Sequence, residues 1–513
     1  GLGFTEDPGD PLDNAGITSE AATGVDINLL DGHQVDVNGY YLNMNWELAE
    51  NVTLKSITGF RDQASQLPSN YVGEVGPISL FDANRADERE TFQQEIRLNW
   101  QATDQLDFVF GGFYQENDTT FCVTQVLGFL DLFGTTLPFG TFNDNPQVLC
   151  NAQDATAYAL YGDMTYQVTD RLTLSGGLRY TWEEKDWIGR NQVFFQALGG
   201  GFDTSLSFAS LGPLGAADFD RFSTGVLESS ADFEEPSWRA VLSYAFTDDI
   251  FGYASVSRSF RSGAFNDQSG TTGAELTPLG VAATEPETVI SYEAGFRTTW
   301  ADGAFTLNPT FFFAQYEDAQ RQIAATLTNS FGQQFQETRF FNAAELEIYG
   351  VELEANWLTP IEGLTIGGNM AWQDGEFESF EADTDFDGII DVDFSNRPLT
   401  RTPEFMYTLF GRYEQPIVND HTLRANIAAA YEDEQVFNYS DVGPQFDTTL
   451  NARTLLSASL EIAGPDDRYF ARVFGRNLTD ERYRVSSQPV ATLWIFSQYG
   501  EPRVWGAEIG ARF

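Results

Sequence analysis

The sequence predicts an all-β fold, a large antiparallel transmembrane β-barrel with about 17 visible strands, long extracellular loops and short periplasmic turns. Three observations predict it. Apolar and polar residues alternate one by one along the chain, the connections between these segments are alternately short and long, and the last segment ends on an aromatic residue. Together these features are typical of a sheet with one face toward lipid and the other toward a polar lumen.

The alternation is clearest in segments 40–48 and 92–100. In the first, the even positions from Tyr40 to Leu48 are all apolar, whereas the odd positions include two asparagines and a glutamate. A period of two indicates strands rather than helices. The C-terminal segment repeats the pattern, with one apolar face formed by Trp505, Ala507, Ile509, Ala511 and Phe513. By the same parity, polar residues that point into the lumen include Glu95, Arg97, Arg179 and Glu508.

The connections fall into two classes that alternate strictly. Short turns are predicted near 49–51, 102–105, 168–171, 247–249, 301–303, 361–363, 418–420 and 464–467. Long loops are predicted near 62–88, 118–153, 188–234, 262–286, 318–345, 376–402, 433–450 and 480–501. Outer-membrane barrels sort their connections in this way, with short periplasmic turns and long extracellular loops. Because the last strand then ends in the periplasm, the first strand at 33–48 starts outside the cell, and residues 1–32 are expected to be part of an extracellular loop.

Composition agrees with a barrel and excludes several other classes. The chain of 513 residues lacks any run of about 18 apolar residues, so no transmembrane helix is expected. Its mean hydropathy of −0.28 is compatible with strands that hide half their residues in a polar lumen. A net charge of −48 argues against a nucleic-acid partner, which needs a basic surface.

The acidity itself has two interpretations. Acidic outer loops can bind divalent cations, and through them anionic lipid head groups. Alternatively, the acidic surface reflects a salty habitat and has no specific ligand.

The two cysteines, Cys122 and Cys150, both fall in the predicted loop 118–153, outside every predicted strand. An even count at close spacing indicates one disulfide in an oxidising compartment. Catalysis is not predicted. The two histidines, His33 and His421, lie far apart in the sequence and have no metal-binding or nucleophile-activating spacing.

Residues 383–393 (Asp-Thr-Asp-Phe-Asp-Gly-Ile-Ile-Asp-Val-Asp) match the first part of a calcium loop. Calcium takes roughly six to eight oxygen ligands, and the glycine at the sixth position permits the sharp turn. The expected ligands are Asp383, Asp385, Asp387, the Ile389 carbonyl and Asp391, with Asp393 in place of the usual glutamate, because the twelfth position is Phe394. The alternative is an acidic, solvated loop without a metal.

Several segments resemble the C-terminal barrel of TonB-dependent receptors. These segments are 172–180, 260–266, 286–297, 350–355 and 475–483, with Ala264 where a second glycine is usual. They occur in family order across 33–513, the predicted barrel domain. The resemblance implies a barrel of about 22 strands. It also implies an N-terminal plug that contacts TonB, so we expect plug and early strands to be missing from this stretch.

The resemblance also implies a function. Such receptors bind a scarce nutrient at their extracellular loops and import it with energy from the TonB complex; the cargo is a small molecule such as a metal chelate, cobalamin or a saccharide. The four lumen residues are then expected to line the substrate path or to contact the plug. Phe513 is expected to be the assembly signal for the barrel-insertion machinery, and the outer surface to contact outer-membrane lipid and lipopolysaccharide. The acidic exterior favours neutral or cationic cargo, although salt screens charges beyond about 8–10 Å.

Two other functions remain open at this point. A passive porin has about 16–18 strands, which matches the predicted count. A structural or adhesive barrel, whose loops bind a partner or a surface layer, would show the same strand pattern.

Overall fold

The computed structural model describes residues 33–70, 82–126, 146–190, 192–193, 226–266, 282–328, 334–383, 389–390, 392–438, 448–490 and 494–511. Its regular structure is almost entirely β-strand, with two short 3₁₀ turns, η7 (Val418–Asp420) and η8 (Pro465–Asp467). None of these described residues belongs to a helix that is long and apolar enough to cross a membrane.

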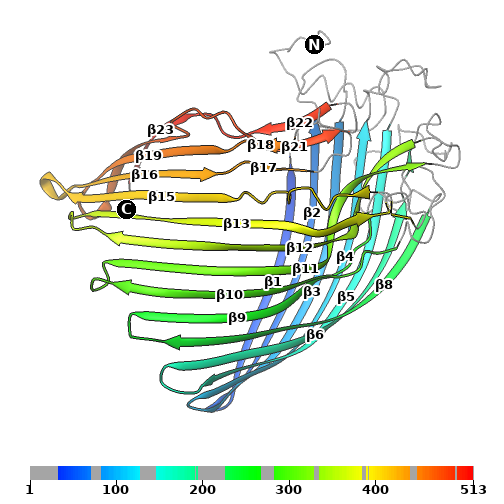
Figure 1. Ribbon diagram of the computed structural model, residues 1–513, viewed down its shortest axis with the longest axis horizontal. Helices are drawn as coiled ribbons and strands as arrows, with labels where there is room; N and C mark the ends of the chain where they lie inside the picture. The colour runs from blue at the N-terminus through cyan, green and yellow to red at the C-terminus, as the bar shows by residue number, and fades with distance from the viewer. Residues whose placement is uncertain are drawn as a thin grey trace, which may run out of the picture.

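One antiparallel sheet of nineteen strands dominates the described part of the chain, and β7 (Gln192–Val193) and β14 (Val392–Asp393) are two-residue additions to it. The long strands follow one another up and down in chain order (Figure 1). They are β1 (Gln34–Ala49), β2 (Val52–Asn70), β3 (Asp82–Thr103), β4 (Leu106–Val126), β5 (Pro146–Gln167), β6 (Leu172–Arg190), β8 (Val226–Ala245), β9 (Ile250–Arg261), β10 (Glu287–Trp300), β11 (Phe305–Thr328), β12 (Gln334–Leu358), β13 (Leu364–Ala382), β15 (Phe405–Pro416), β16 (Thr422–Glu432), β19 (Arg453–Ala463), β20 (Tyr469–Arg476) and β23 (Val504–Ala511). This confirms the predicted all-β fold and the predicted number of strands.

Two small strand pairs lie outside the main sheet. They are β17 (Gln435–Val436) with β18 (Thr449–Leu450), and β21 (Arg484–Val490) with β22 (Trp494–Tyr499).

The eight predicted short turns are present, all at one end of the strands, and the longer connections lie at the other end (Figure 1). Four of these turns contain left-handed residues, among them Asp302 with φ 52°, Asn419 with φ 58° and Asp466 with φ 56°. Asparagine and aspartate tolerate this conformation better than other residues with a side chain, which explains why such residues occupy the turns.

Several long loops are shorter than predicted. The predicted loop 318–345 is mostly strand, because β11 continues to Thr328 and β12 starts at Gln334. The predicted loop 118–153 likewise loses its ends to β4 and β5. Beyond the bilayer both faces of a hairpin meet water, so the apolar alternation that marks a strand fades there although the backbone pairing continues.

The sheet has two ends within the described residues. β1 pairs only with β2, and β23 pairs only with β20, so the curved sheet is not closed on itself (Figure 1). Residues 1–32, which were predicted to form part of an extracellular loop, lie outside the described residues.

The strand register separates two faces. On one face, Leu98 of β3 lies opposite Phe110 of β4, and Leu160 of β5 lies opposite Tyr180 of β6. On the C-terminal strand, Trp505 and Ile509 lie on this face and are 69% and 87% exposed. Large exposed apolar side chains on one face of a sheet are typical of contact with lipid. The other face carries the polar residues.

A small buried core lies at the loop end of β11, β12 and β13. Phe394 and Leu399, from the segment between β13 and β15, belong to one cluster with Leu346, Phe377 and Phe380. The backbone N–H of Phe394 donates to the Phe380 carbonyl (2.7 Å), so this segment is held against the strands. Along the rest of the described sheet the side chains divide between a polar and an apolar face.

Strand glycines leave room for aromatic rings. A Cβ atom at Gly111 would lie 2.3 Å from Cζ of Tyr161, the directly opposite residue on β5, and a Cβ at Gly506 would lie 2.3 Å from Cζ of Phe474. In both pairs the ring lies over the glycine of the neighbouring strand. Such pairing compensates for the missing side chain of the glycine.

Adjacent glycines on β4 provide a test of this packing. We expect Gly111→Ala to lower the free energy of unfolding by about 1–3 kcal/mol, because the added methyl group displaces the Tyr161 ring. Gly112→Ala is the matched control, since its Cβ would meet Leu160 at an ordinary 3.6 Å. Urea unfolding of the full-length protein in lipid vesicles measures both. Equal stability of the two variants would contradict the packing argument.

Candidate functional site

The four polar residues predicted to face the lumen all lie on the polar face of the sheet. Glu95 and Arg97 lie on β3, Arg179 on β6 and Glu508 on β23. The register places two of them, Arg97 and Arg179, in one row across β3 to β6 with Gly111 and Tyr161, and Tyr161 adds Glu95 as a third. Glu508 lies apart from this row and forms an ion pair with Arg472 of β20.

Tyr161 links this group, and the sequence analysis did not single it out. Its ring crosses Gly111, and its hydroxyl donates a hydrogen bond to the Glu95 carboxylate. The Arg179 guanidinium lies 5.1 Å from the Phe113 ring centre and 5.9 Å from that of Tyr161. Tyr161 could have been predicted from its pairing with a strand glycine, but that pairing is visible only once the register of β4 and β5 is known.

Other polar-face arginines are paired with carboxylates. Arg239 contacts Asp163 through Nε (3.0 Å) and Nη2 (2.9 Å), across the position of Gly177. Arg424 of β16 pairs with Glu461 of β19 at 3.1 Å. These charge-assisted contacts hold polar side chains of neighbouring strands in fixed positions.

A cavity of about 1200 Å³ lies over β10 to β19, and its charged lining residues are Arg297, Glu352, Glu354, Arg412, Glu432 and Arg453. At the loop end of this cavity, Arg453 pairs with Glu432 at 2.7 Å and lies 5.2 Å from the Tyr483 ring centre. Polar walls with both signs of charge suit a hydrated ligand or a polar protein surface better than an apolar molecule.

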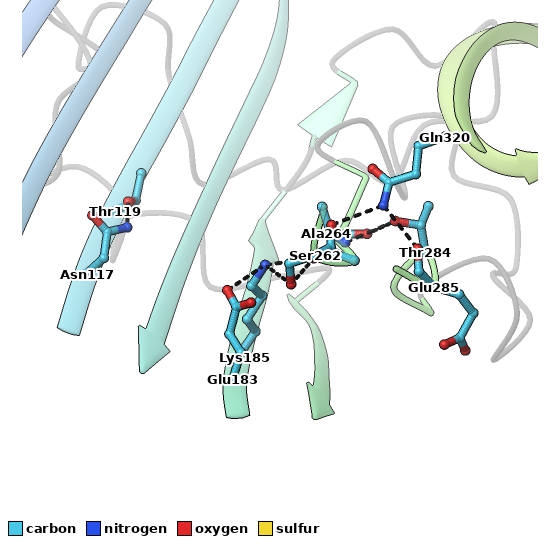
Figure 2. A network of polar contacts seen from close by, with 10 residues as sticks. Asn117, Thr119, Glu183, Lys185, Ser262, Ala264, Thr284, Glu285 and Gln320 are labelled. Atoms are coloured by element: carbon cyan, nitrogen blue, oxygen red, sulfur yellow. Dashed lines mark hydrogen bonds and ion pairs between the residues drawn. The ribbon is translucent and has the colours of Figure 1, made fainter. Parts of the chain in front are cut away.

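A second polar network lies where β6 meets the connection between β9 and β10 (Figure 2). The Lys185 ammonium, whose side chain is 10% exposed, has three acceptors: Ser262 Oγ (3.0 Å), the Gly263 carbonyl (2.7 Å) and Glu183 (3.0 Å). Three acceptors satisfy the three donors of an ammonium group. Lys185 therefore holds Ser262 and Gly263, at the start of the connection, against β6.

The same network ties the two ends of this connection together. The Gln320 amide donates to the Ser262 and Glu285 carbonyls, at 3.0 Å each, and Thr284 Oγ1 accepts from the Ala264 N–H at 3.0 Å (Figure 2). A Cβ at Gly263 would lie 1.9 Å from the Thr284 carbonyl oxygen, so only glycine fits there. Sequence reasoning placed 260–266 at the start of a loop but missed Lys185 and Gln320, which are far away in sequence.

The predicted calcium ligands are only partly described. Asp385, Asp387 and Asp391 lie outside the described residues. Ile389 is 66% exposed, and Asp393 accepts a hydrogen bond from the Ser395 N–H at 2.9 Å. The Ser395 hydroxyl and N–H lower the pKa of Asp393. Among the described residues no group of three or more metal-binding side chains is present.

The two cysteines are direct cross-strand partners, Cys122 on β4 and Cys150 on β5. The prediction that both lie in a loop outside any strand is therefore wrong. These strands extend beyond the bilayer, where the apolar alternation fades. Antiparallel partners have Cα atoms about 4.5–5.5 Å apart. A disulfide spans such distances.

Phe513 follows β23 and lies outside the described residues, so its predicted role as an assembly signal stays a prediction. Of the other sequence-predicted residues, His421 lies at a short turn, where its ring contacts Tyr469.

Residues 2–478 match the model of a protein family described as TonB dependent receptor-like, beta-barrel. The chain belongs to the TonB-dependent receptor family. Members of this family are bacterial outer-membrane transporters and not enzymes. The polar face of the sheet is accordingly its lumen wall, and the apolar face is its lipid side.

Individual relatives are more distant than the family match. The pesticin receptor of Yersinia pestis is 27% identical over 217 residues, which are 42% of this chain and 26% of that receptor. The structure of the ferric yersiniabactin uptake receptor of Yersinia pestis matches with a TM-score of 0.67 and 17% identity, over 93% of this chain and 61% of that one. The siderophore receptor PiuA of Acinetobacter baumannii matches with a TM-score of 0.63 and 14% identity, over 93% and 64%. The chain thus spans less than two thirds of the length of these receptors, and at these identities the structures establish the shared fold alone.

Lys185 permits a direct test of the network in Figure 2. We expect Lys185→Met to destabilise this region by about 2–4 kcal/mol, because it removes three hydrogen bonds and leaves the largely buried Glu183 carboxylate without its cation. Proteinase K should then cleave this variant faster between residues 262 and 286. Lys55→Met, at the only other lysine of the chain, is the control. Unchanged cleavage of the Lys185 variant would show that Lys185 does not hold the connection.

Proposed function

We propose that this chain forms most of the barrel wall of an outer-membrane receptor that imports a scarce nutrient, most simply a metal chelate. The observation that carries the proposal is the charged cavity on the lumen wall, in a sheet that has the fold of TonB-dependent receptors. The similar proteins point the same way, because one is named a ferric yersiniabactin uptake receptor and another a siderophore receptor.

The proposal includes parts outside this chain. A plug and about five further strands, which would bridge β1 and β23, complete a barrel of about 22 strands. The TonB complex acts on that plug. A passive porin is less favoured, since the chain matches the receptor family along most of its length.

The lipid side supports placement in the outer membrane with lipopolysaccharide around it. Trp100 stacks on Phe108 near the short turns (5.4 Å between ring centres), and Tyr158 stacks on Trp182 nearer the loops (5.6 Å). Two such aromatic belts mark the interfaces of outer-membrane barrels. We also propose that Phe513 is read by the barrel-insertion machinery.

Uptake is tested by deleting the gene and growing the strain under metal limitation with a panel of ferric chelates. We expect growth on at least one chelate to be lost and to return with the full-length gene. The control for energised import is a variant without the plug, whose open barrel lets solutes leak in without the TonB complex. Normal growth on every chelate, with lost adhesion to surfaces instead, would favour an adhesive barrel.

We also propose a disulfide between Cys122 and Cys150, supported by their opposed positions in the β4–β5 register. Closing this hairpin would stabilise the fold by about 3–4 kcal/mol in the chain-entropy model. Non-reducing mass spectrometry of the native protein should find the two peptides joined. Recovery of two alkylated thiols would exclude the bridge.

A calcium ion bound by 383–393 is a further proposal, supported by the spacing of its carboxylates. Chelator treatment should increase protease cleavage within this segment, and added calcium should reverse the effect. Asp385→Asn should remove the response to calcium, whereas Asp302→Asn, in a turn at the opposite end of the strands, should not. Cleavage that does not change with calcium would indicate a solvated acidic loop without a metal.

A further inference from the structure

Three basic side chains share one row of the lumen wall. Lys55 of β2 lies directly opposite Arg97 of β3, and the same row continues through Gly111 and Tyr161 to Arg179 of β6. We call Lys55, Arg97 and Arg179 the cation row. It lies in the membrane-spanning part of the sheet, between the levels of the Trp100 and Tyr158 belts on the lipid side.

The cation row lacks the carboxylate partners found elsewhere on this wall. Arg239, Arg424 and Arg472 each form an ion pair, whereas none of the three members of the row does so within the described residues. Lys55 and Arg97 even face each other directly, and like charges in that position repel. This is notable in a chain with 76 acidic and only 28 basic residues.

The carboxylate two residues from Arg97 on β3, that of Glu95, is already engaged. Glu95 accepts the hydrogen bond of the Tyr161 hydroxyl, which keeps it next to that ring. Arg97 Nε is buried and finds no acceptor among the described residues. Buried donors nearly always have a partner, so this nitrogen indicates an acceptor that the described residues do not supply.

The Arg179 side chain is held in a fixed position from which it can donate to such an acceptor. Its Nε donates to Thr181 Oγ1 at 3.1 Å, and its guanidinium plane is supported by the Phe113 and Tyr161 rings. Its terminal nitrogens have no acceptor in the described part of the chain. A guanidinium fixed in this way offers paired N–H donors that match a carboxylate or phosphate.

We propose that the cation row binds anionic oxygen, of the carboxylate or phosphate type, inside the lumen. This rests on the proposed function and narrows its cargo to molecules that carry such groups. The charge of the exterior favours neutral or cationic cargo, but the lumen wall is the surface that cargo must pass, and the cation row gives that wall local positive charge. The same oxygen chemistry has two sources: a diffusing anion, or a carboxylate of a protein segment that enters the lumen.

The test uses the full-length receptor in detergent, with citrate as the probe and isothermal titration as the measurement. We expect Arg97→Gln/Arg179→Gln to bind citrate at least about tenfold more weakly than wild type, because two charge-assisted contacts are lost. The control is Arg61→Gln, on β2, which lacks an ion pair among the described residues but lies outside both the row and the charged cavity. It should bind like wild type. Arg97→Lys/Arg179→Lys keeps the charge and should lose only part of the affinity.

The two sources of anionic oxygen give different results. If a fixed carboxylate occupies the row, wild type will not bind citrate, and Arg97→Gln/Arg179→Gln will unfold at lower urea while Arg61→Gln will not. Citrate binding and urea unfolding that are both unchanged in the double variant would overturn the inference. The growth assay on ferric chelates tests the proposed function separately from the cation row. Uptake that persists in a protein whose cation row binds no anion would overturn this inference alone, and citrate binding in a protein that supports no uptake would overturn the proposed function alone.

Discussion

Backbone pairing is the constraint on which the rest of this structure depends. In hydrocarbon no water is available for an N–H or C=O group, so each must find a partner within the protein. The long antiparallel registers, from β1–β2 to β20–β23, provide these partners. They also fix the direction of every side chain. A slip of one residue between β3 and β4 would turn the whole side-chain set of one strand to the other face, and with it the alignment of Arg97 to Gly111.

Once the register is fixed, side-chain size decides which polar groups can meet. Adjacent strands are only about 4.8 Å apart, so long side chains on neighbouring strands compete for space. Gly111 and Gly177 relieve this competition at two points. The first lets Tyr161 reach Glu95 on β3, and the second lets Arg239 reach Asp163. The polar face is thereby cross-linked over several strands, which keeps its charged groups in defined positions.

The sequence alone predicted the features that repeat with the period of the strand. Side-chain parity placed Glu95, Arg97, Arg179 and Glu508 on one face, and the turn residues located all eight short turns. The sequence did not predict the strands where apolar and polar residues stop alternating. Cys122 and Cys150 belong to strands that extend into water on both faces, where polar residues no longer alternate with apolar ones. Their pairing in β4 and β5 depends on a register that only the folded sheet defines.

The contacts that hold the extracellular rim were beyond prediction for a different reason. Lys185 is 77 residues from Ser262, and Gln320 is 58 residues from it, so no local pattern connects them. The rarity of lysine nevertheless indicated that Lys185 has a specific role, because the chain has only two lysines. In so acidic a protein each lysine had many possible carboxylate partners, and only the three-dimensional structure identifies Glu183 as one of them.

Charge is distributed unequally between the two faces of this sheet. On the lipid side, beyond the Tyr158–Trp182 belt toward the loops, Asp118, Asp154 and Asp186 lie directly opposite one another on β4, β5 and β6. Burial, and then repulsion from Asp118 and Asp186, raise the pKa of Asp154. A carboxyl group whose pKa is raised by folding stabilises the fold only while it keeps its proton, so this row costs stability as the pH rises through that pKa. On the lumen side, Lys55 and Arg97 lie directly opposite each other and repel with the opposite sign of charge. An acidic row on β4 to β6 and a directly opposed basic pair on β2 and β3, on opposite faces of the sheet, are hard to explain by packing, since a neutral residue at any of these positions would relieve the repulsion. Their effect is on the electrostatic potential of each face, which is negative toward the surroundings of the protein and positive toward molecules that pass through the lumen.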